Sequence, residues 1–585
     1  MWSVGKGEIV PVAGRNSSMP TAVVLGEGGV VVTTHRTLII GLDGATFDLV
    51  TPWAEAGYLP TLARLMAEGV HGPLKAWPNM NSAAAWSSMI TGYNPGQHGI
   101  FSFNNAPGRG DGGWRPVTAL DRQKDPFWRL LSRAGESVGV VNVPISYPAD
   151  AVSGFMISGM DAPGTHSSGV CHPAELLGEL RSEGIDYVLE APDPSDERQR
   201  AQGILPDEVR QMVDARARAV LHLMKSRRWN TFMAVFVAPD RMQHHFWPAE
   251  NASLEDDAWA PIRETYRLID THLGTIVAEA GDETTVLVVS DHGFGPARPV
   301  RHHLNRLLAD LGYVRFRQGT GRLRGRMLEA ALAAGRRLVP QRLRFHLAHA
   351  LSGFVSKARA EHRYPGIDWS RTRVAATSSG GGVQVNTVER RASGTVPAAE
   401  YLAVRDEIRD VLSRLVDPAT GRSLVRSVHR REDLYRGPYA DQAADLVIEW
   451  DFESLGQALC HESGGRRVIV EAQPGKVSRR KVSGDHRPYG VLIAHGAEIR
   501  HGAEVDDAKL YDIAPTVLHL RGQPIPADMD GRVLSAVFTD EFLTRNPVRF
   551  TEPSSETDDS LTGPGLGEQD TKVIEDRLRS LGYLD

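Results

Sequence analysis

The feature that most constrains the fold is a repeated order of strand-length apolar runs, polar residues and helix-like stretches. The runs begin at Thr37, Ser137, Thr231 and Thr285 and read TLIIGLDG, SVGVVNVP, TFMAVFVAPD and TVLVVSDHG. Helix-like stretches with apolar spacings of three and four residues include 60–69 and 206–226. Strands that alternate with helices predict an α/β domain with a mostly parallel sheet, whose two faces the helices cover.

Length and charge narrow the class of protein further. The chain has 585 residues, enough for one large enzyme-sized body or for several smaller modules. Hydrophobic residues make up 41% and charged residues 24%, which is typical of globular proteins. Subtracting 72 Asp and Glu from 66 Lys and Arg gives a net charge of −6. The overall positive charge that favours nucleic-acid binding is absent, so no specific nucleic-acid partner is expected.

Cysteine usage limits the kinds of metal site that the chain can build. The two cysteines, Cys171 and Cys460, are far apart in sequence and form no CxxC pair. They therefore predict neither a disulfide framework nor a thiolate metal centre. Any bound metal would have to be held by histidine and carboxylate side chains.

The sequence contains no signal for a membrane. No apolar run reaches about 18 residues, the length that a membrane-spanning helix needs. The first 36 residues lack a basic start followed by an uninterrupted apolar core. We therefore expect no transmembrane segment, a cytoplasmic location, and a poorly ordered tail over residues 1–36.

The remaining chain divides where its composition changes. Residues 37–310 and 366–545 are expected to form two parts of one catalytic α/β domain, and residues 546–585 an acidic linker with a C-terminal helix. Residues 311–365 are expected to form an inserted basic helical cap, because 315–363 contains twelve Arg or Lys but only Glu329 and Glu361 as acids. This insertion is either a solvated cap or a lid that attracts an anionic substrate.

Acidic and histidine residues follow the strand-like runs, at the edge where open α/β sheets place their ligands. They are Asp43, Asp240, His244, Asp291, His292 and His486. Three carboxylates and three imidazoles suit two divalent cations, above all zinc, with manganese or iron as alternatives. Two such ions would hold the attacking and leaving oxygens of an in-line displacement at phosphorus.

Each of these residues alone has a simpler interpretation. An Asp after a strand often caps the next helix, and His244 and His245 are compatible with buried, merely hydrogen-bonded imidazoles. The joint occurrence of an Asp, an Asp-x-x-x-His and an Asp-His at three strand ends favours a metal site. In that arrangement, His245 is expected to point away from the cations.

Longer motifs extend along most of the chain, from about Thr37 to Phe538. They include LIIGLDGATFD, WPNMNSAAAWSSMITGYNPGQHGIFSF, APDRMQHHFWP, VVSDHGF, SGDHRPYGVLIAHG and DIAPTVLHLRGQPIPADMDGRVL. In this order they resemble the alkaline phosphatase superfamily, and within it the type I phosphodiesterase/nucleotide pyrophosphatase family. The resemblance implies an alkaline-phosphatase-like three-layer sandwich around a mostly parallel central sheet.

The resemblance also implies a role for each candidate residue. One cation would be bound by Asp43, Asp291, His292 and the nucleophile oxygen, and the second by Asp240, His244 and His486. The family's nucleophile lies ten residues before the Gly of a Thr-Gly pair, which here is Thr91–Gly92 and selects Ser82. Ser82 precedes a helix-like stretch, so a helix N-cap is a compatible structural role for it.

One position departs from the family. Nucleotide pyrophosphatases carry an Asn three residues after the nucleophile that holds the phosphoryl oxygens, whereas this chain has Ala85. Asn79 and Asn81 are the available substitutes. His98, within the GQHGI motif, is expected to hold the loop around the nucleophile.

These observations predict a metal-dependent hydrolase of phosphodiester or pyrophosphate bonds that forms a phosphoserine at Ser82. Hydrolysis of phosphate monoesters or sulfate esters and phosphoryl transfer are alternatives, because the same metal site supports them. A third alternative is a non-catalytic, metal-stabilised binding protein whose basic segment recruits an anionic partner. The expected partner is a small phosphate ester, and the sequence leaves the oligomeric state open.

Overall fold

The computed structural model describes residues 35–104, 115–191, 205–317, 366–377, 380–463, 465–472, 483–553 and 567–580. Within these ranges, no helix combines the length and the apolar composition that a membrane span requires. The predicted basic insertion and the acidic linker fall mainly on residues 318–365 and 554–566, outside the described part of the chain.

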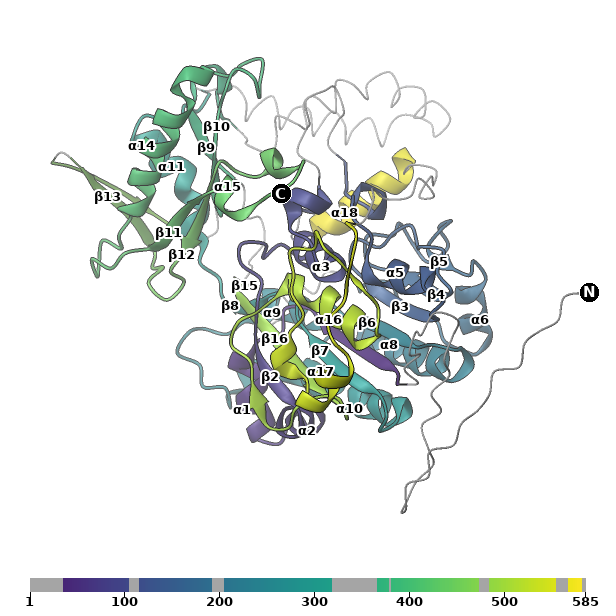
Figure 1. Cartoon of the computed structure of the whole chain (residues 1–585). Coiled ribbons are helices and arrows are strands. Elements are labelled where there is room, and N and C mark those ends of the chain that lie inside the picture. The colour runs from purple at the N-terminus through teal and green to yellow at the C-terminus, as the bar shows by residue number, and fades with distance from the viewer. Residues whose placement is uncertain are drawn as a thin grey trace, which may run out of the picture.

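A large mixed sheet forms the centre of the molecule (Figure 1). Its strands are β1 (Thr37–Leu42), β2 (Val70–Lys75), β3 (Val138–Val143), β4 (Gly154–Ser158), β5 (Cys171–His172), β6 (Thr231–Phe236), β7 (Thr285–Val289), β16 (Tyr489–His495), β17 (Ala503–Glu504) and β18 (Ala508–Lys509). They lie in the order β17-β2-β16-β7-β1-β6-β3-β4-β5, with β18 beside β2. Strands β7, β1, β6, β3 and β4 run parallel, whereas β16 and β5 are antiparallel to their neighbours.

The central strands form because their apolar runs are buried on both faces. Every residue of β1, β6 and β7 is buried, as expected for parallel strands covered by helices on both sides. At the carboxyl ends of the three strands, Leu42 of β1 lies opposite Phe236 of β6 and the preceding Gly41 lies opposite Val289 of β7, so the strands end at nearly the same level. This register places the residues that follow these strands at one edge of the sheet.

Helices pack on both faces of this sheet (Figure 1). The helices of the main body are α1 (Phe47–Glu55), α2 (Pro60–Glu68), α3 (Ser82–Thr91), α4 (Pro95–His98), α5 (Phe127–Arg133), α6 (Leu176–Ser182), α8 (Asp207–Ser226), α9 (Ala238–Phe246), α10 (Ala260–Ala280), α16 (Ile513–Leu520), α17 (Asp540–Arg545) and α18 (Glu568–Ser580). Short 3-10 helices occupy Ala119–Asp121, Asp257–Trp259, Pro299–His303, Trp369–Arg371, Ala398–Glu400, Ala440–Gln442, Leu510–Asp512 and Ser535–Val537. The predicted α/β class, with a mostly parallel sheet between layers of helices, is confirmed.

A smaller lobe with its own sheet lies beside the main one (Figure 1). It contains α11 (Leu304–Asp310), α14 (Tyr401–Ser413), α15 (Arg431–Leu434), β9 (Val374–Ala376), β10 (Gly382–Val385), β11 (Val425–Arg430), β12 (Leu446–Trp450), β13 (Ala458–Ser463) and β14 (Arg466–Glu471). The sheet order is β11-β12-β10-β9, and residues such as Leu304, Val383 and Ile408 form a second hydrophobic core.

Besides the antiparallel pair of β13 and β14 in the small lobe, two further strand pairs lie outside these sheets. Strand β8 (Gly293–Pro296) pairs antiparallel with β15 (Gly484–Arg487), and β19 (Ile525–Pro526) pairs with β20 (Phe550–Thr551). Because β8 precedes the small lobe and β15 follows it, the chain leaves and re-enters the main body through adjacent strands.

Candidate active site

The three central strands deliver five of the candidate residues to one place. Asp43 follows β1, Asp291 and His292 follow β7, and Asp240 and His244 lie on α9, which follows β6. Because β1 lies between β6 and β7 and the three strands are parallel, their carboxyl ends are adjacent. The sheet topology therefore brings these side chains together.

The sixth candidate reaches the site by a different route. His486 lies on β15 and is paired with Phe294 of β8, directly after the segment that carries His292. The imidazole rings of His292 and His486 stack with centroids 3.6 Å apart. The antiparallel pair therefore brings a residue from late in the sequence to the ends of the central strands.

A first group of ligand-type atoms surrounds the nucleophile candidate. It comprises Asp43, Asp291 and His292, whose ligand-type atoms lie within 4.8 Å of one another. The Nε2 atom of His292 is 3.2 Å from Asp291 Oδ2 and 3.7 Å from Asp43 Oδ1. Ser82 Oγ lies 3.1 Å from the same Nε2. One position between these atoms could thus be shared by a cation and the serine oxygen.

A second group is centred on Asp240, with His292 and His486. Asp240 Oδ1 lies 3.3 Å from His244 Nε2, 3.4 Å from His486 Nε2 and 3.9 Å from His292 Nε2. The Nε2 atoms of His244 and His486 are 3.1 Å apart. His245, although buried, belongs to neither group of ligand atoms among the described residues.

Backbone carbonyl groups fix the orientation of all three imidazoles. The Nδ1 atoms pair with carbonyl oxygens at 3.1 Å for His244 and Gly484, 3.0 Å for His292 and Gly293, and 2.6 Å for His486 and Met80. A carbonyl can only accept, so Nδ1 carries the proton and Nε2 presents its lone pair to the carboxylates. This is the arrangement that metal-binding histidines adopt.

The electrostatics of the site fit a cation. Burial, together with the charges of Asp291 and Asp240, raises the pKa of Asp43 well above its ordinary value. Burial and the charge of Asp240 raise the pKa of Asp291 to about 7. Asp43 Oδ1 and Asp291 Oδ2 are buried and accept no hydrogen bond from the described residues. A divalent ion would relieve both the repulsion between these carboxylates and the lack of a partner.

Asp240 differs from the other two carboxylates because nitrogen atoms of His244, His486 and Arg241 surround it. Burial alone would raise the pKa of Asp240, but His244 and His486 outweigh that effect and hold the pKa well below its ordinary value. The guanidinium of Arg241 also donates to Asp240 Oδ2 at 3.2 Å and to Glu190 Oε2 at 3.1 Å. No motif in the sequence marks Glu190, and the only signal for Arg241 is its place directly after Asp240.

Trp86 also supports a candidate ligand, and it was not among the residues predicted from the sequence. Its indole N–H donates to Asp43 Oδ2 at 3.1 Å. A Cβ at Gly41 would lie 2.6 Å from the Trp86 ring, so only glycine at this position of β1 lets the indole approach. Trp86 lies four residues after Ser82 on α3, a spacing that could have placed both on one helix face.

Ser82 is the first residue of α3, and its helix is capped by a neighbour. The side chain of Asn81 is the N-cap and accepts from the Ala83 amide at 3.2 Å. Ser82 is therefore not needed as a cap. Its Oγ lies at the positive end of the helix, where a phosphoryl group is favoured.

Asn79 and Asn81 are the predicted substitutes for the asparagine that the family carries where this chain has Ala85. The Asn79 amide donates to Tyr511 Oη at 2.7 Å, and its oxygen accepts from Tyr435 Oη at 3.1 Å. Asn81 Oδ1 caps α3. The oxygens of both side chains thus have structural partners.

His98 holds together the end of α4 and the nucleophile helix. It is fully buried, its Nδ1 accepts from the Ile100 amide at 3.2 Å, and its Nε2 pairs with Ser88 Oγ at 2.9 Å. Burial and the nearby Arg122 lower the pKa of His98 to about 3. The imidazole is therefore neutral and acts as a structural link.

We expect this neutral imidazole to make stability depend on pH. An unfolded chain binds a proton at His98 below about pH 6.5, while the folded protein excludes it down to about pH 3. His98 should thus lower the free energy of unfolding as pH falls below about 6.5, by roughly 2 kcal/mol at pH 5. Denaturant unfolding should show that the free energy of unfolding differs less between pH 7.5 and pH 5 in His98→Gln than in the wild type. His166→Gln, at an exposed histidine, is the control. If His98→Gln and the wild type lost the same free energy of unfolding between pH 7.5 and pH 5, His98 would not be the cause of the pH dependence.

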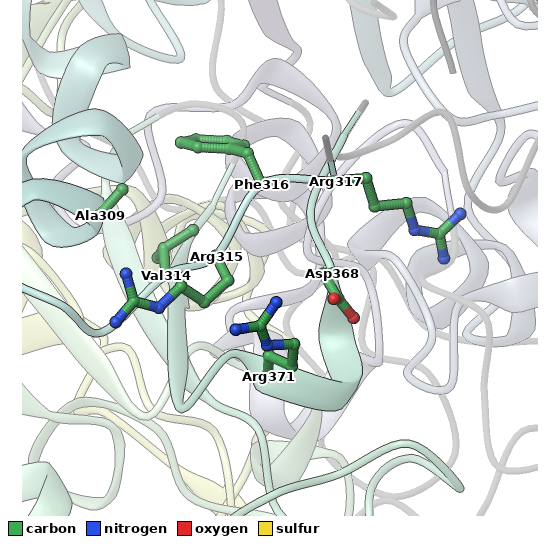
Figure 2. Close-up of a pocket in the computed structure, with 7 residues that line it drawn as sticks. All are labelled: Ala309, Val314, Arg315, Phe316, Arg317, Asp368 and Arg371. Carbon is green, nitrogen blue, oxygen red and sulfur yellow. The ribbon is translucent and has the colours of Figure 1, made fainter. Parts of the chain in front are cut away.

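A separate cavity of about 340 Å³ lies in the small lobe and is rich in arginine (Figure 2). Its lining residues are Ala309, Val314, Arg315, Phe316, Arg317, Asp368 and Arg371. None of the candidate metal or nucleophile residues lines it. The cluster at the ends of the central strands is therefore the candidate active site.

Comparison with known proteins gives one extensive match and several distant ones. A family model for type I phosphodiesterase/nucleotide pyrophosphatase matches residues 37–455, which excludes His486. A search of curated proteins gives no match. The solved structure of human ectonucleotide pyrophosphatase/phosphodiesterase 5 is 13% identical with a TM-score of 0.43, and the match covers 88% of this chain and 99% of that one. The murine protein, also solved as an inactive variant in complex with AMP, is 13% identical with a TM-score of 0.44, and the match covers 84% of this chain and 95% of that one.

Proposed function

The chain belongs to the type I phosphodiesterase/nucleotide pyrophosphatase family, and we propose that it hydrolyses a phosphodiester or pyrophosphate bond through a covalent phosphoserine at Ser82. Membership of this family makes the protein an enzyme of the alkaline phosphatase superfamily, which is metal-dependent. The proposal adds the nucleophile, the ligands and the type of intermediate.

One observation carries the proposal. The Oγ atom of Ser82 lies 3.1 Å from His292 Nε2, beside a group of buried carboxylates that includes Asp43 and Asp291. A serine hydroxyl is a weak nucleophile on its own and needs activation by a base or a cation. The position of Ser82 at this cluster, and at the start of α3, supports its role as the attacking group.

The chemistry follows from the positions of the side chains. Asp43, Asp291 and His292 would hold one divalent ion together with Ser82, and Asp240, His244 and His486 would hold the other. When bound, such ions stabilise a serine alkoxide and the charge that develops on the leaving oxygen. Zinc fits the mixture of imidazole and carboxylate ligands best, and manganese and iron are the alternatives.

The reaction has two displacement steps. Ser82 Oγ forms a bond to phosphorus as the bond to the leaving oxygen breaks, and that oxygen takes up a proton. Water then attacks the phosphoserine, which releases the phosphoryl product and restores the Ser82 hydroxyl. The N-terminus of α3 favours the negative charge of the phosphoryl group in both steps.

A substrate panel with metal control tests the proposal. We expect bis-p-nitrophenyl phosphate and dinucleoside polyphosphates to be hydrolysed faster than p-nitrophenyl phosphate or p-nitrophenyl sulfate. A chelator should remove this activity and added zinc should restore it, because the three carboxylates repel one another without a cation. Including sugar nucleotides and an alcohol acceptor in the panel identifies the leaving group and any phosphoryl transfer.

Each alternative function gives a different result in this panel. Faster turnover of the monoester or the sulfate ester would favour a phosphomonoesterase or a sulfatase. Phosphorylation of the acceptor alcohol would favour a transferase. Metal binding without turnover of any ester would favour the non-catalytic binding protein.

A further inference from the structure

The C-terminal helix α18 packs against the first turn of the nucleophile helix. Ile574 is 0% and Leu578 is 1% exposed, and both belong to a small apolar cluster that includes Ala83, the residue after Ser82. The other members are Ile100, Phe103, Val117, Ile145 and Met160. Figure 1 shows α18 beside α3, although the two helices come from opposite ends of the described chain. The apolar face of α18 thus covers the surface next to the nucleophile.

A partly buried arginine, Arg577, attaches α18 to a second segment near the site. Arg577 donates to the carbonyl oxygens of Met160 at 2.9 Å and of Pro163 at 2.9 Å, and also to that of Ala162. One guanidinium therefore satisfies three carbonyl groups in the turn that follows β4. Because its donors form a rigid planar fork, Arg577 fixes the shape of this turn as well as its position.

This turn, residues 160–163, also contacts the candidate metal site. The sulfur of Met160 lies 3.2 Å from Nη2 of Arg241, and Arg241 donates to Asp240 at 3.2 Å. Arg241 also donates to the Glu190 carboxylate at 3.1 Å. The side chains of Arg241, Asp240 and Glu190 are each at most 3% exposed. With so little room, a shift of the turn would move Arg241 and alter the orientation of Asp240.

We propose that α18 is a positioning element of the active site, in which Arg577 and Ile574 fix Asp240 and the start of α3 in their catalytic arrangement. The inference rests on the proposed function, because it assumes that Asp240 holds a metal and that Ser82 attacks. Two contacts lead from α18 to these residues, one through Ala83 and one through Met160 and Arg241.

Helix α18 is connected through the chain itself to the body against which it packs. The described residues before α18 end at Pro553 and resume at Gly567, so the helix is tethered to the body that it contacts. A helix of 13 residues is only marginally stable alone in water, so α18 should gain its structure from this contact. The tether makes docking intramolecular and therefore favourable.

The first test replaces the arginine and measures metal binding as well as turnover. In the full-length protein, Arg577→Ala should lower both the zinc affinity and kcat for bis-p-nitrophenyl phosphate by roughly 10- to 100-fold, the usual effect of losing a partner behind a metal ligand. KM should change little, because Arg577 is not expected to touch the substrate. Arg577→Lys, which retains a cationic donor, should recover part of both losses. Lys572→Ala on the exposed side of α18 is the matched control.

The second test detaches the apolar face of the helix. Ile574→Asp should release α18, which hydrogen exchange of residues 567–580 reports directly, and should lower zinc affinity and kcat in the same way. Val573→Asp introduces the same charge at a neighbouring position that is 41% exposed, and should leave helix docking, zinc affinity and kcat unchanged.

The results separate this inference from the proposed function. If the wild type neither binds zinc nor cleaves the diester, the proposed function is wrong. If the wild type does both, but a detached helix leaves zinc affinity and kcat unchanged, only the role of α18 is wrong. A fall in both quantities that follows a lower Tm of the whole body, without recovery in Arg577→Lys, would also overturn it, because α18 would then be merely structural.

Discussion

Replacement of Ser82 by alanine should abolish turnover and leave the metal content nearly intact. The substitution removes the oxygen that attacks phosphorus, so kcat should fall at least about 1000-fold. The carboxylates and imidazoles around Ser82 remain, so Asp43, Asp291 and His292 can still hold the metal. Zinc analysis and kcat for bis-p-nitrophenyl phosphate, measured on the same preparation, check both parts.

Ser87→Ala is the matched control for this variant. Ser87 is buried on the same helix, but its hydroxyl has no hydrogen-bond partner among the described residues and lies outside both groups of ligand atoms. Its removal should leave kcat within a few-fold of the wild type. An unchanged kcat in Ser82→Ala, or absence of the phosphoserine in rapidly quenched wild-type enzyme, would assign the nucleophile to another residue.

Asp291→Asn should lose metal as well as rate. The change preserves shape but removes one negative charge from the group that includes Asp43 and His292. We expect zinc content to fall with kcat/KM, which should drop more than about 100-fold because a direct ligand matters at least as much as its supporting partners. The difference from Ser82→Ala separates a ligand from a nucleophile.

The same variant should also alter how metal binding depends on pH. Burial and the charge of Asp240 raise the pKa of Asp291 to about 7, so in the metal-free protein this carboxyl is protonated below that pH. Zinc must displace the proton, and wild-type affinity should therefore decrease as pH falls through 7. Calorimetry should show that zinc affinity depends less on pH in Asp291→Asn than in the wild type. Asp270→Asn, at a carboxylate that bonds the Thr61 and Leu62 amides, is the control, and equal zinc loss there would contradict the assignment.

The sequence predicted the central strands, and the meeting of the residues that follow them, because one physical rule governs each. Apolar runs of strand length predicted β1, β6 and β7 because strands covered on both faces must be apolar throughout. Once these strands are parallel neighbours, the residues after them must meet, which places Asp43, Asp240 and Asp291 together. No long-range information beyond the sheet order was needed for these three.

Other parts of the site depend on contacts that no local pattern reports. His486 reaches the cluster through the pairing of β15 with β8, so its place there does not follow from the order of the central strands. Glu190 lies on a segment without regular structure, so nothing in its neighbourhood marks it as a partner of Arg241. Likewise, the helical pattern near the C-terminus predicted α18 but could not indicate the surface against which it packs.

The pairing of β8 with β15 also sets the order in which the site can be completed during protein synthesis. All three residues of the first group, Asp43, Asp291 and His292, have been translated once the ribosome has passed β7. The second group requires His486, and the small lobe must be synthesised first, which at cellular elongation rates takes roughly 10 to 40 seconds. A nascent chain therefore passes through a period in which one half of the cluster can form while the other lacks a histidine.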